Sequence, residues 1–222
     1  MRVMGVDGCR GGWLAALAGA DGRVSWRWTA SVTELLAQPA EAVAVDMPIG
    51  LAESGRRACD VQARRLLGRR AASVFAAPVR PVLGCATYAE ARAVLAARGG
   101  PSMSAQAFGI VAAVRDLDTA VAAADDGRVV EAHPELAFLA MTGAALASKK
   151  TEPGRVQRLA ALTATWPDVA DLVALAPKPA APDDALDALA CAWVARRWLR
   201  GDAQVLGDGT RDSRNLPMRI AY

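Results

Sequence analysis

The stretch Val3-Met-Gly-Val-Asp7-Gly-Cys-Arg-Gly-Gly-Trp13 decides the fold that we expect for this 222-residue chain. Four apolar or small residues run directly into Asp7, and glycines follow at once. This pattern predicts a buried strand that ends in a tight turn. Because a carboxylate at the end of a buried strand is costly without a partner, we expect other parts of the chain to meet Asp7.

The apolar run at 42–46 predicts a second strand that ends in a carboxylate, Asp46. Such near-continuous runs are typical of parallel strands that are buried on both faces. Between the two strands, residues 13–18 and 24–29 predict a hairpin, and residues 31–38 predict a short helix. This helix is the crossover that returns the chain parallel to its first strand.

A fifth strand is expected at 128–134, after a glycine turn. The predicted fold class is therefore α/β, with a mixed five-stranded sheet of order 3-2-1-4-5 flanked by helices. In this order Asp7 and Asp46 end adjacent parallel strands, at the edge where open α/β sheets bind their ligands.

The last predicted helix, at 183–199, opens with Asp183-Asp-Ala-Leu-Asp187. Asp184 and Asp187 lie three residues apart, on the same side of this helix. Two carboxylates on one buried face repel each other unless a cation neutralises them. Asp184 can also be explained by the helix dipole, which favours any carboxylate in the first turn. For Asp187, we favour metal binding.

The region at about 53–126 predicts a large helical insertion after the fourth strand. It is rich in alanine and arginine, and it includes expected helices at 87–98 and 104–124. The length of 222 residues and the hydrophobic content of 53% support one domain over 1–222 that carries this insertion.

Composition excludes several classes of protein. No apolar run approaches the ~20 residues that span a membrane. Four scattered cysteines without a C-x-x-C pair, and a single histidine, argue against structural zinc. Reduced thiols are typical of a cytoplasmic protein, which is the location that we expect. The net charge of +3 permits a polyanionic partner without requiring one, and the oligomeric state, including a homodimer, stays open.

Each candidate site residue has a structural and a functional interpretation. Asp7 and Asp46 are either turn residues or ligands of Mg²⁺ or Mn²⁺, and their equivalent places at two strand ends favour the second interpretation. Glu131 is either a surface residue at a strand end or a member of the acidic cluster. His133 is either a hydrogen-bonded turn residue or a group that orients water or contacts phosphate.

Basic residues offer candidate contacts with nucleic acid, although arginine pairs on helices are also common on solvated faces. The chain has no phosphate-binding G-x-x-x-x-G-K-[ST] loop, no dinucleotide fingerprint and no G-x-S-x-G nucleophile turn. The candidates for nucleic-acid binding are Arg10, Arg57, Arg64, Arg65, Lys149 and Lys150.

The order of strands and carboxylates resembles the RNase H-like superfold. A set of motifs along nearly the whole chain resembles one prokaryotic family of domains of unknown function, described as predicted nucleases with an RNase H-like fold. The residues that carry the resemblance are 6–13, 45–50, 57–64, 73–80, 106–110, 131–135, 148–151 and 183–188.

This resemblance implies a metal-dependent nuclease that hydrolyses phosphodiester bonds of DNA or RNA. One or two Mg²⁺ or Mn²⁺ ions, about 4 Å apart, would activate water and stabilise the leaving oxygen. The implied metal ligands are Asp7, Asp46, Asp184 and Asp187, and the further catalytic candidates are Glu131 and His133.

The last motif is also similar to that of Holliday-junction resolvase-type nucleases, although these usually carry Glu where this chain has Asp46. Two alternatives on the same superfold are a non-catalytic module that binds nucleic acid or protein, and a small-molecule phosphotransferase. The related actin-like kinases use a strand-end Asp and a glycine turn, but the chain is short for their two lobes.

Overall fold

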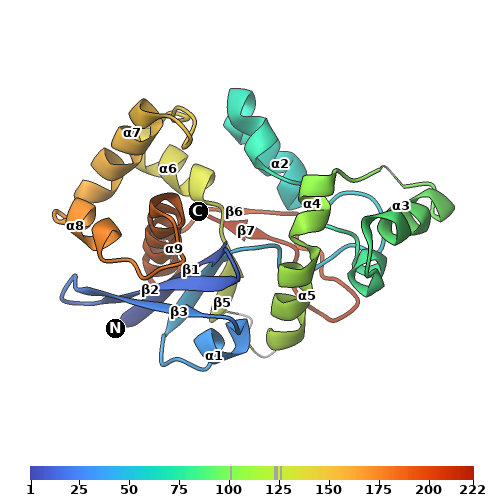
Figure 1. The fold of residues 1–222 in the computed structure, drawn as a ribbon, viewed down its shortest axis with the longest axis horizontal. Helices are drawn as coiled ribbons and strands as arrows, with labels where there is room; N and C mark the ends of the chain where they lie inside the picture. Colours follow the sequence, from blue (N-terminus) through green and yellow to red (C-terminus); the bar gives the residue numbers. More distant parts are fainter. Residues whose placement is uncertain (101, 123–124, 126) are drawn as a thin grey trace.

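A five-stranded mixed sheet forms the centre of the protein (Figure 1). The computed structural model describes residues 1–100, 102–122, 125 and 127–222. Strands β1, β2 and β3 form an antiparallel meander, whereas β4 and β5 run parallel to β1. The strand order β3-β2-β1-β4-β5 confirms the prediction. The strands are β1 (Arg2–Cys9), β2 (Gly12–Gly19), β3 (Val24–Thr29), β4 (Ala42–Asp46) and β5 (Val129–Glu131).

The register of the parallel strands brings acidic residues to one edge of the sheet. Asp7 on β1 pairs with Asp46 on β4, and Val45 on β4 pairs with Glu131 on β5. Carboxyl ends of neighbouring parallel strands meet at the same edge, which is where sheets of this kind bind ligands. The fold thus places Asp7 beside Asp46 through backbone pairing alone.

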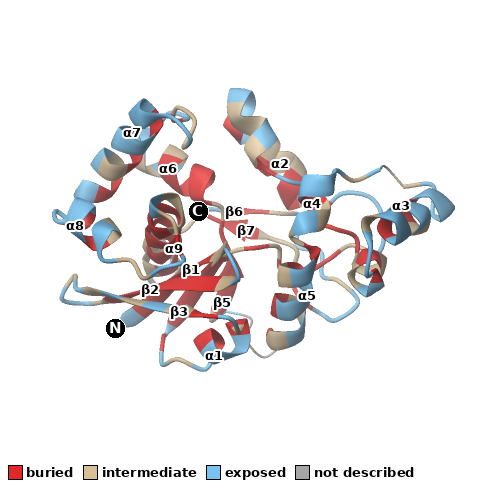
Figure 2. Cartoon of the chain, viewed as in Figure 1, coloured by how far each residue is buried: buried red, intermediate tan, exposed pale blue. Residues whose placement is uncertain are grey.

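Helices cover both faces of the sheet (Figure 1). The long helix α9 (Pro182–Arg200) packs on one face against β1, β2 and β4, and α1 (Val32–Leu36) and α5 (Val111–Ala120) cover the other face. Since side chains alternate along a strand, Ala44 faces α9 whereas Val43 and Val45 face α1 and α5. Figure 2 shows the buried residues concentrated in these central layers. Beside α9 lie α6 (Pro134–Thr142), α7 (Glu152–Thr163) and α8 (Val169–Ala174).

Helix α9 lies unusually close to β1, and Gly5 makes this possible. A Cβ atom at Gly5 would lie 2.0 Å from the backbone nitrogen of Ala192 and 2.1 Å from the carbonyl oxygen of Ala188. Only a glycine on the strand, facing alanines on the helix, permits such an approach of two backbones. This contact fixes the distance between the strand that carries Asp7 and the helix that carries Asp187.

A helical region follows β4, as predicted. It consists of short helices on the side of the molecule away from α7 and α8 (Figure 1), and its residues contribute to two further clusters of buried side chains. Its described elements are α2 (Ala58–Leu67), the 3-10 helices η1 (Gly68–Ser73) and η2 (Arg80–Gly84), α3 (Tyr88–Ala97), α4 (Ala105–Gly109) and α5.

The prediction of one continuous helix at 104–124 is wrong. The segment is divided into α4 and α5 at Ile110, and α5 ends at Ala120. The two parts have different partners, because Phe108 packs on the Tyr88 ring of α3, whereas α5 packs on the sheet. Gly109, a poor helix former, lies at the division. Positions 123 and 124 lie outside the described residues.

The C-terminal segment adds a small element that the sequence patterns did not predict. Strands β6 (Val205–Leu206) and β7 (Ile220–Ala221) pair antiparallel, and Ala221 bridges to Ala132 just beyond β5. No helix in the described parts of the chain is both long enough and apolar enough to cross a membrane.

Candidate metal centre

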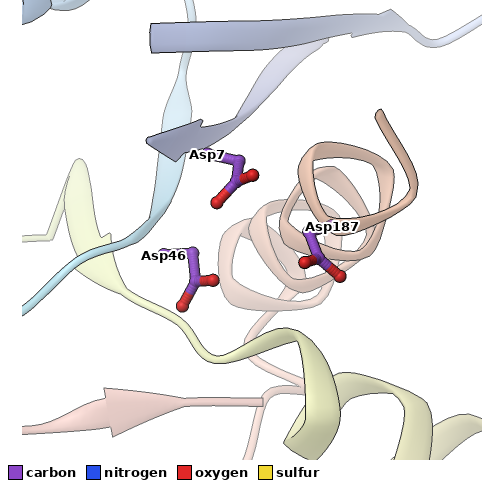
Figure 3. Close-up of side chains that lie close together, drawn as sticks. All are labelled: Asp7, Asp46 and Asp187. Carbon is purple, nitrogen blue, oxygen red and sulfur yellow. The ribbon is translucent and has the colours of Figure 1, made fainter. Parts of the chain in front are cut away.

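Asp7, Asp46 and Asp187 meet at the carboxyl edge of the sheet (Figure 3). Asp7 lies near the end of β1, Asp46 closes β4, and Asp187 lies in the second turn of α9. One oxygen atom from each carboxylate lies within 4.8 Å of the other two. Oxygen ligands lie about 2.0–2.6 Å from Mg²⁺ or Ca²⁺, so two ligands of one ion stand at most about 5 Å apart. The three carboxylates are therefore spaced to share a cation.

Burial makes the charges of this cluster costly. Burial and the neighbouring charges of Asp187 and Asp46 raise the pKa of Asp7 well above its usual value. Burial also raises the pKa of Asp187 to about 7, against the lowering effect of Lys149. For Asp46, burial likewise raises the pKa to about 7. Carboxylates that resist ionisation at neutral pH have much to gain from a cation.

Lys149 supplies an internal cation to the cluster. Its Nζ atom donates a hydrogen bond to Oδ2 of Asp187 at 2.5 Å. Burial opposes the charge of the ammonium, but Asp187, Asp7 and Asp46 outweigh it and raise the pKa of Lys149. The carboxylates were expected to need a cation, and Lys149 was expected to contact nucleic acid. In the structure, Lys149 neutralises part of the acidic charge.

Asp184 does not belong to the cluster of three, although we predicted it as a metal ligand. Its Oδ2 atom accepts a hydrogen bond from the backbone N–H of Ala181 at 2.8 Å. Helical spacing put Asp184 and Asp187 on one side of α9, but the backbone N–H of the N-cap residue Ala181 holds the carboxylate of Asp184. Asp184 therefore caps the helix and lines the rim of the cleft.

A buried ion-pair network adjoins the three aspartates. Arg57 contacts Glu131 at 2.6 Å and Asp60 at 2.5 Å, and Glu131 accepts a hydrogen bond from the backbone N–H of Ile49 at 2.7 Å. The prediction that Arg57 contacts nucleic acid is wrong, because its side chain is 2% exposed. Glu131 is not a free acidic ligand but holds the turn that follows Asp46. A periodic pattern cannot distinguish a buried, paired arginine from an exposed one.

His133 is engaged through both ring nitrogens. Its Nδ1 atom accepts a hydrogen bond from the backbone N–H of Glu135 at 3.2 Å, and Nε2 lies 3.3 Å from the carbonyl oxygen of Ser73. Burial lowers the pKa of His133, which keeps the imidazole neutral at pH 7. The ring caps α6, so this geometry favours the structural interpretation of His133 over a role in proton transfer.

Glu135 pairs with two arginines that were not among the predicted site residues. Its Oε1 atom contacts Arg158 at 2.6 Å and Arg70 at 3.2 Å. Arg158 is fully buried, whereas the side chain of Arg70 is 28% exposed. Arg158 lies four residues before the buried Leu162, on the apolar side of α7. An arginine on the apolar side of a helix indicates a buried acidic partner, and this was the signal in the sequence that could have identified the pair.

The three aspartates line a cleft with a volume of about 570 Å³. Of the residues predicted to contact nucleic acid, Arg10 and Arg65 are exposed outside this cleft, and Arg64 lines a second cavity. The cleft thus combines an acidic floor with a basic part of its wall. The basic residues that line the cleft are Arg70, Lys149 and Lys150.

The sequence profile of a family described as "Protein of unknown function (DUF429)" matches residues 5–211. This chain belongs to the DUF429 family. The match includes all three aspartates of the cluster as well as Lys149. Neither a curated protein nor a solved structure matches this DUF429 chain.

We expect the metal-free DUF429 protein to lose stability as the pH rises from about 4 to about 7. Asp46 and Asp187 have pKa values of about 7 in the folded protein, against about 3.9 for an aspartate in an unfolded chain. The folded state therefore binds more protons between these values, and its free energy of unfolding falls as the protons leave. Thermal melts in EDTA across this range measure the decline.

Added Mn²⁺ competes with the same protons, so its stabilising effect should grow between pH 6 and pH 8. Other titrating groups contribute to the slope, and an Asp187→Asn variant separates them, because it should show a shallower decline and little response to Mn²⁺. Equal responses to Mn²⁺ at pH 6 and pH 8 would contradict metal binding by these carboxylates.

Proposed function

We propose that this DUF429 chain is a divalent-metal-dependent nuclease that hydrolyses phosphodiester bonds of DNA or RNA. We further propose that residues 1–222 form one RNase H-like domain, with a helical insertion at about 53–126. The observation that carries the proposal is the meeting of Asp7, Asp46 and Asp187 within 4.8 Å at the floor of a cleft. The basic side chains on the wall of the same cleft support a polyanionic substrate.

The donor atoms suit Mg²⁺ or Mn²⁺, because hard divalent cations prefer carboxylate oxygens. When bound, such an ion activates a water molecule and stabilises the leaving oxygen of a phosphodiester. The aspartates come from two adjacent strands and one long helix, which are rigid elements. Such elements hold ligands with the accuracy that catalysis requires.

The basic residues of the cleft would bind and orient the substrate. Lys150 is exposed, and Lys149 has a side chain that is 37% exposed, so both can reach a phosphate in the cleft. Contacts of this kind give affinity without sequence recognition. His133 is held by Glu135 and Ser73, so the carboxylate cluster is left to direct the chemistry.

The decisive experiment incubates the purified protein with single-stranded, duplex, hybrid and branched substrates of labelled DNA and RNA. We expect cleavage of at least one substrate in Mg²⁺ or Mn²⁺ and none in EDTA. An Asp7→Asn protein prepared in parallel controls for a contaminating nuclease. Cleavage that persists in EDTA or in this variant would contradict the proposal.

Failure to cleave any substrate in either ion would also reject a nuclease. If Mn²⁺ still raised the melting temperature in that case, the three aspartates would bind metal for another purpose. Binding of nucleic acid without cleavage would then favour the binding module, and transfer of phosphate from ATP to a small molecule would favour the phosphotransferase.

A further inference from the structure

A second cavity, with a volume of about 200 Å³, lies beside the cleft of the three aspartates. It is formed by the segment between β4 and β5. The two cavities have a common wall, because Ala72, Val74 and Phe75 line both of them. The rest of its apolar lining includes Val79, Val82, Leu95 and Met103.

Phe75 has an unusual exposure for an aromatic residue in this protein. It is 47% exposed, whereas the other aromatic residues of the described chain are half-buried or buried. The loop that carries it is held in place, because Arg64 donates a hydrogen bond to the carbonyl oxygen of Val74 at 2.6 Å, and Asp60 accepts one from the N–H of Ala77 at 3.1 Å. An ordered loop thus presents an apolar ring at the boundary of two cavities, and apolar and aromatic side chains are the usual lining of pockets that bind small ligands.

The second cavity also has a positive rim. Arg56, Arg64 and Arg98 line it, and Arg56 and Arg98 are exposed. Glu53 is the acidic residue that lines it, and this carboxylate already accepts a hydrogen bond from Ser213 at 2.8 Å and lies 3.8 Å from Arg80. The rim therefore retains positive charge next to apolar walls.

Apolar walls, an exposed aromatic ring and a positive rim together favour a ligand with a flat ring attached to an anionic group. Aromatic side chains and arginine guanidinium groups bind the faces of nucleobases in single-stranded nucleic acids, and arginines also bind phosphate. Pockets for a whole ligand usually measure about 300–1,000 Å³, so this cavity is suited to one ring system of a larger substrate. The exposed Arg56 and Arg98 on the rim favour a ligand that carries a negative charge over an uncharged apolar group.

We propose that the second cavity binds a nucleobase of the substrate, stacked on Phe75, while the adjoining backbone phosphate lies in the cleft of the aspartates. This inference rests on the proposed function for its choice of substrate. It makes Phe75 a residue that selects substrate rather than a catalytic residue. It also predicts that unpaired nucleotides are favoured over duplex, because a paired base cannot enter a cavity.

The test measures binding by calorimetry in EDTA, where no cleavage occurs. The probes are the nucleoside 5′-monophosphates and, for comparison, ribose 5-phosphate. We expect at least one nucleotide to bind at least tenfold more tightly than ribose 5-phosphate. Phe75→Ala should abolish this preference and Phe75→Trp should retain it, while the affinity for ribose 5-phosphate stays unchanged in both.

A matched control is Leu175→Ala, which removes a 71% exposed side chain from the end of α8 without altering either cavity. Thermal melts verify that each variant is folded. Equal affinity for nucleotides and ribose 5-phosphate, or a preference that survives Phe75→Ala, would overturn the inference.

The outcome is independent of the nuclease test. A base preference that depends on Phe75, without cleavage of any polynucleotide, would reject the proposed activity and retain the nucleobase site. Metal-dependent cleavage without a base preference would retain the proposed activity and reject the nucleobase site.

Discussion

Asp7→Asn should reduce metal-dependent cleavage at least about 1,000-fold, because loss of even an outer-shell partner of a metal ligand typically costs 10–100-fold. Asp7 lies near the end of β1, and one of its oxygen atoms is within 4.8 Å of an oxygen atom of Asp46 and of Asp187. An amide there provides a weaker oxygen ligand and removes one of the three negative charges. Initial rates over a series of Mn²⁺ concentrations measure the loss.

The same substitution should not unfold the protein. Burial and two neighbouring carboxylates raise the pKa of Asp7, so the neutral side chain suits its surroundings at least as well as the charged one. Asp183→Asn is the matched control, since Asp183 begins the same helix as Asp187 and lies outside the cleft lining. Full activity of Asp7→Asn, or equal losses in both variants, would refute a role for this cluster in catalysis.

Gly5→Ala should lower the free energy of unfolding by at least about 3 kcal/mol, since overpacking typically costs 1–3 kcal/mol and the clash here involves the backbone. The added methyl group would lie 2.0 Å and 2.1 Å from backbone atoms of Ala192 and Ala188, where real contacts are essentially never below 3.0 Å. Strand β1 and helix α9 must then separate along the core. Thermal melts should show this as a decrease of about 6–12 °C, or the variant will fail to fold.

A glycine in open space provides the comparison. Gly84, at the end of η2, has no other group within 4 Å of an added Cβ atom, so Gly84→Ala should leave the melting temperature nearly unchanged. If Gly5→Ala had the same melting temperature as the wild type, the close approach of β1 and α9 would be contradicted. With that approach, the placement of Asp187 beside Asp7 would also lose its basis.

The sheet was predictable because its signals are local. Alternation at 24–29, the glycine turns and the buried run that ends in Asp46 each specify one strand, and the rule for crossover connections orders them. Parallel pairing then places Asp7 beside Asp46 without any knowledge of side chains. Asp187 could be predicted for a similar reason, since helical periodicity places its carboxylate on an apolar face of the helix.

The charge partners of Asp187 and Glu131 were not predictable, because both lie far away in the sequence. Lys149 meets Asp187 across 38 residues, and Arg57 meets Glu131 across 74. No periodicity relates such pairs, so two basic residues in similar local patterns, Arg57 and Arg65, differ completely in burial. The need for a glycine at position 5 could not be predicted either, since the helix that packs on it, α9, lies near the opposite end of the chain.

The position of Lys149 means that metal binding by the three aspartates would be an exchange of ions. Under the proposed function, a divalent cation bound by Asp187 would compete with the ammonium of Lys149, which is tethered to the chain and therefore present at a high effective concentration. The observed free energy of metal binding would be less favourable than the intrinsic one by the free energy of the Lys149–Asp187 pair. The charge at the three carboxylates would then rise by one instead of two, while the released ammonium would stay in the cleft, where a phosphate would bind. Metal binding and the binding of an anionic substrate would thereby be coupled through the side chain of Lys149.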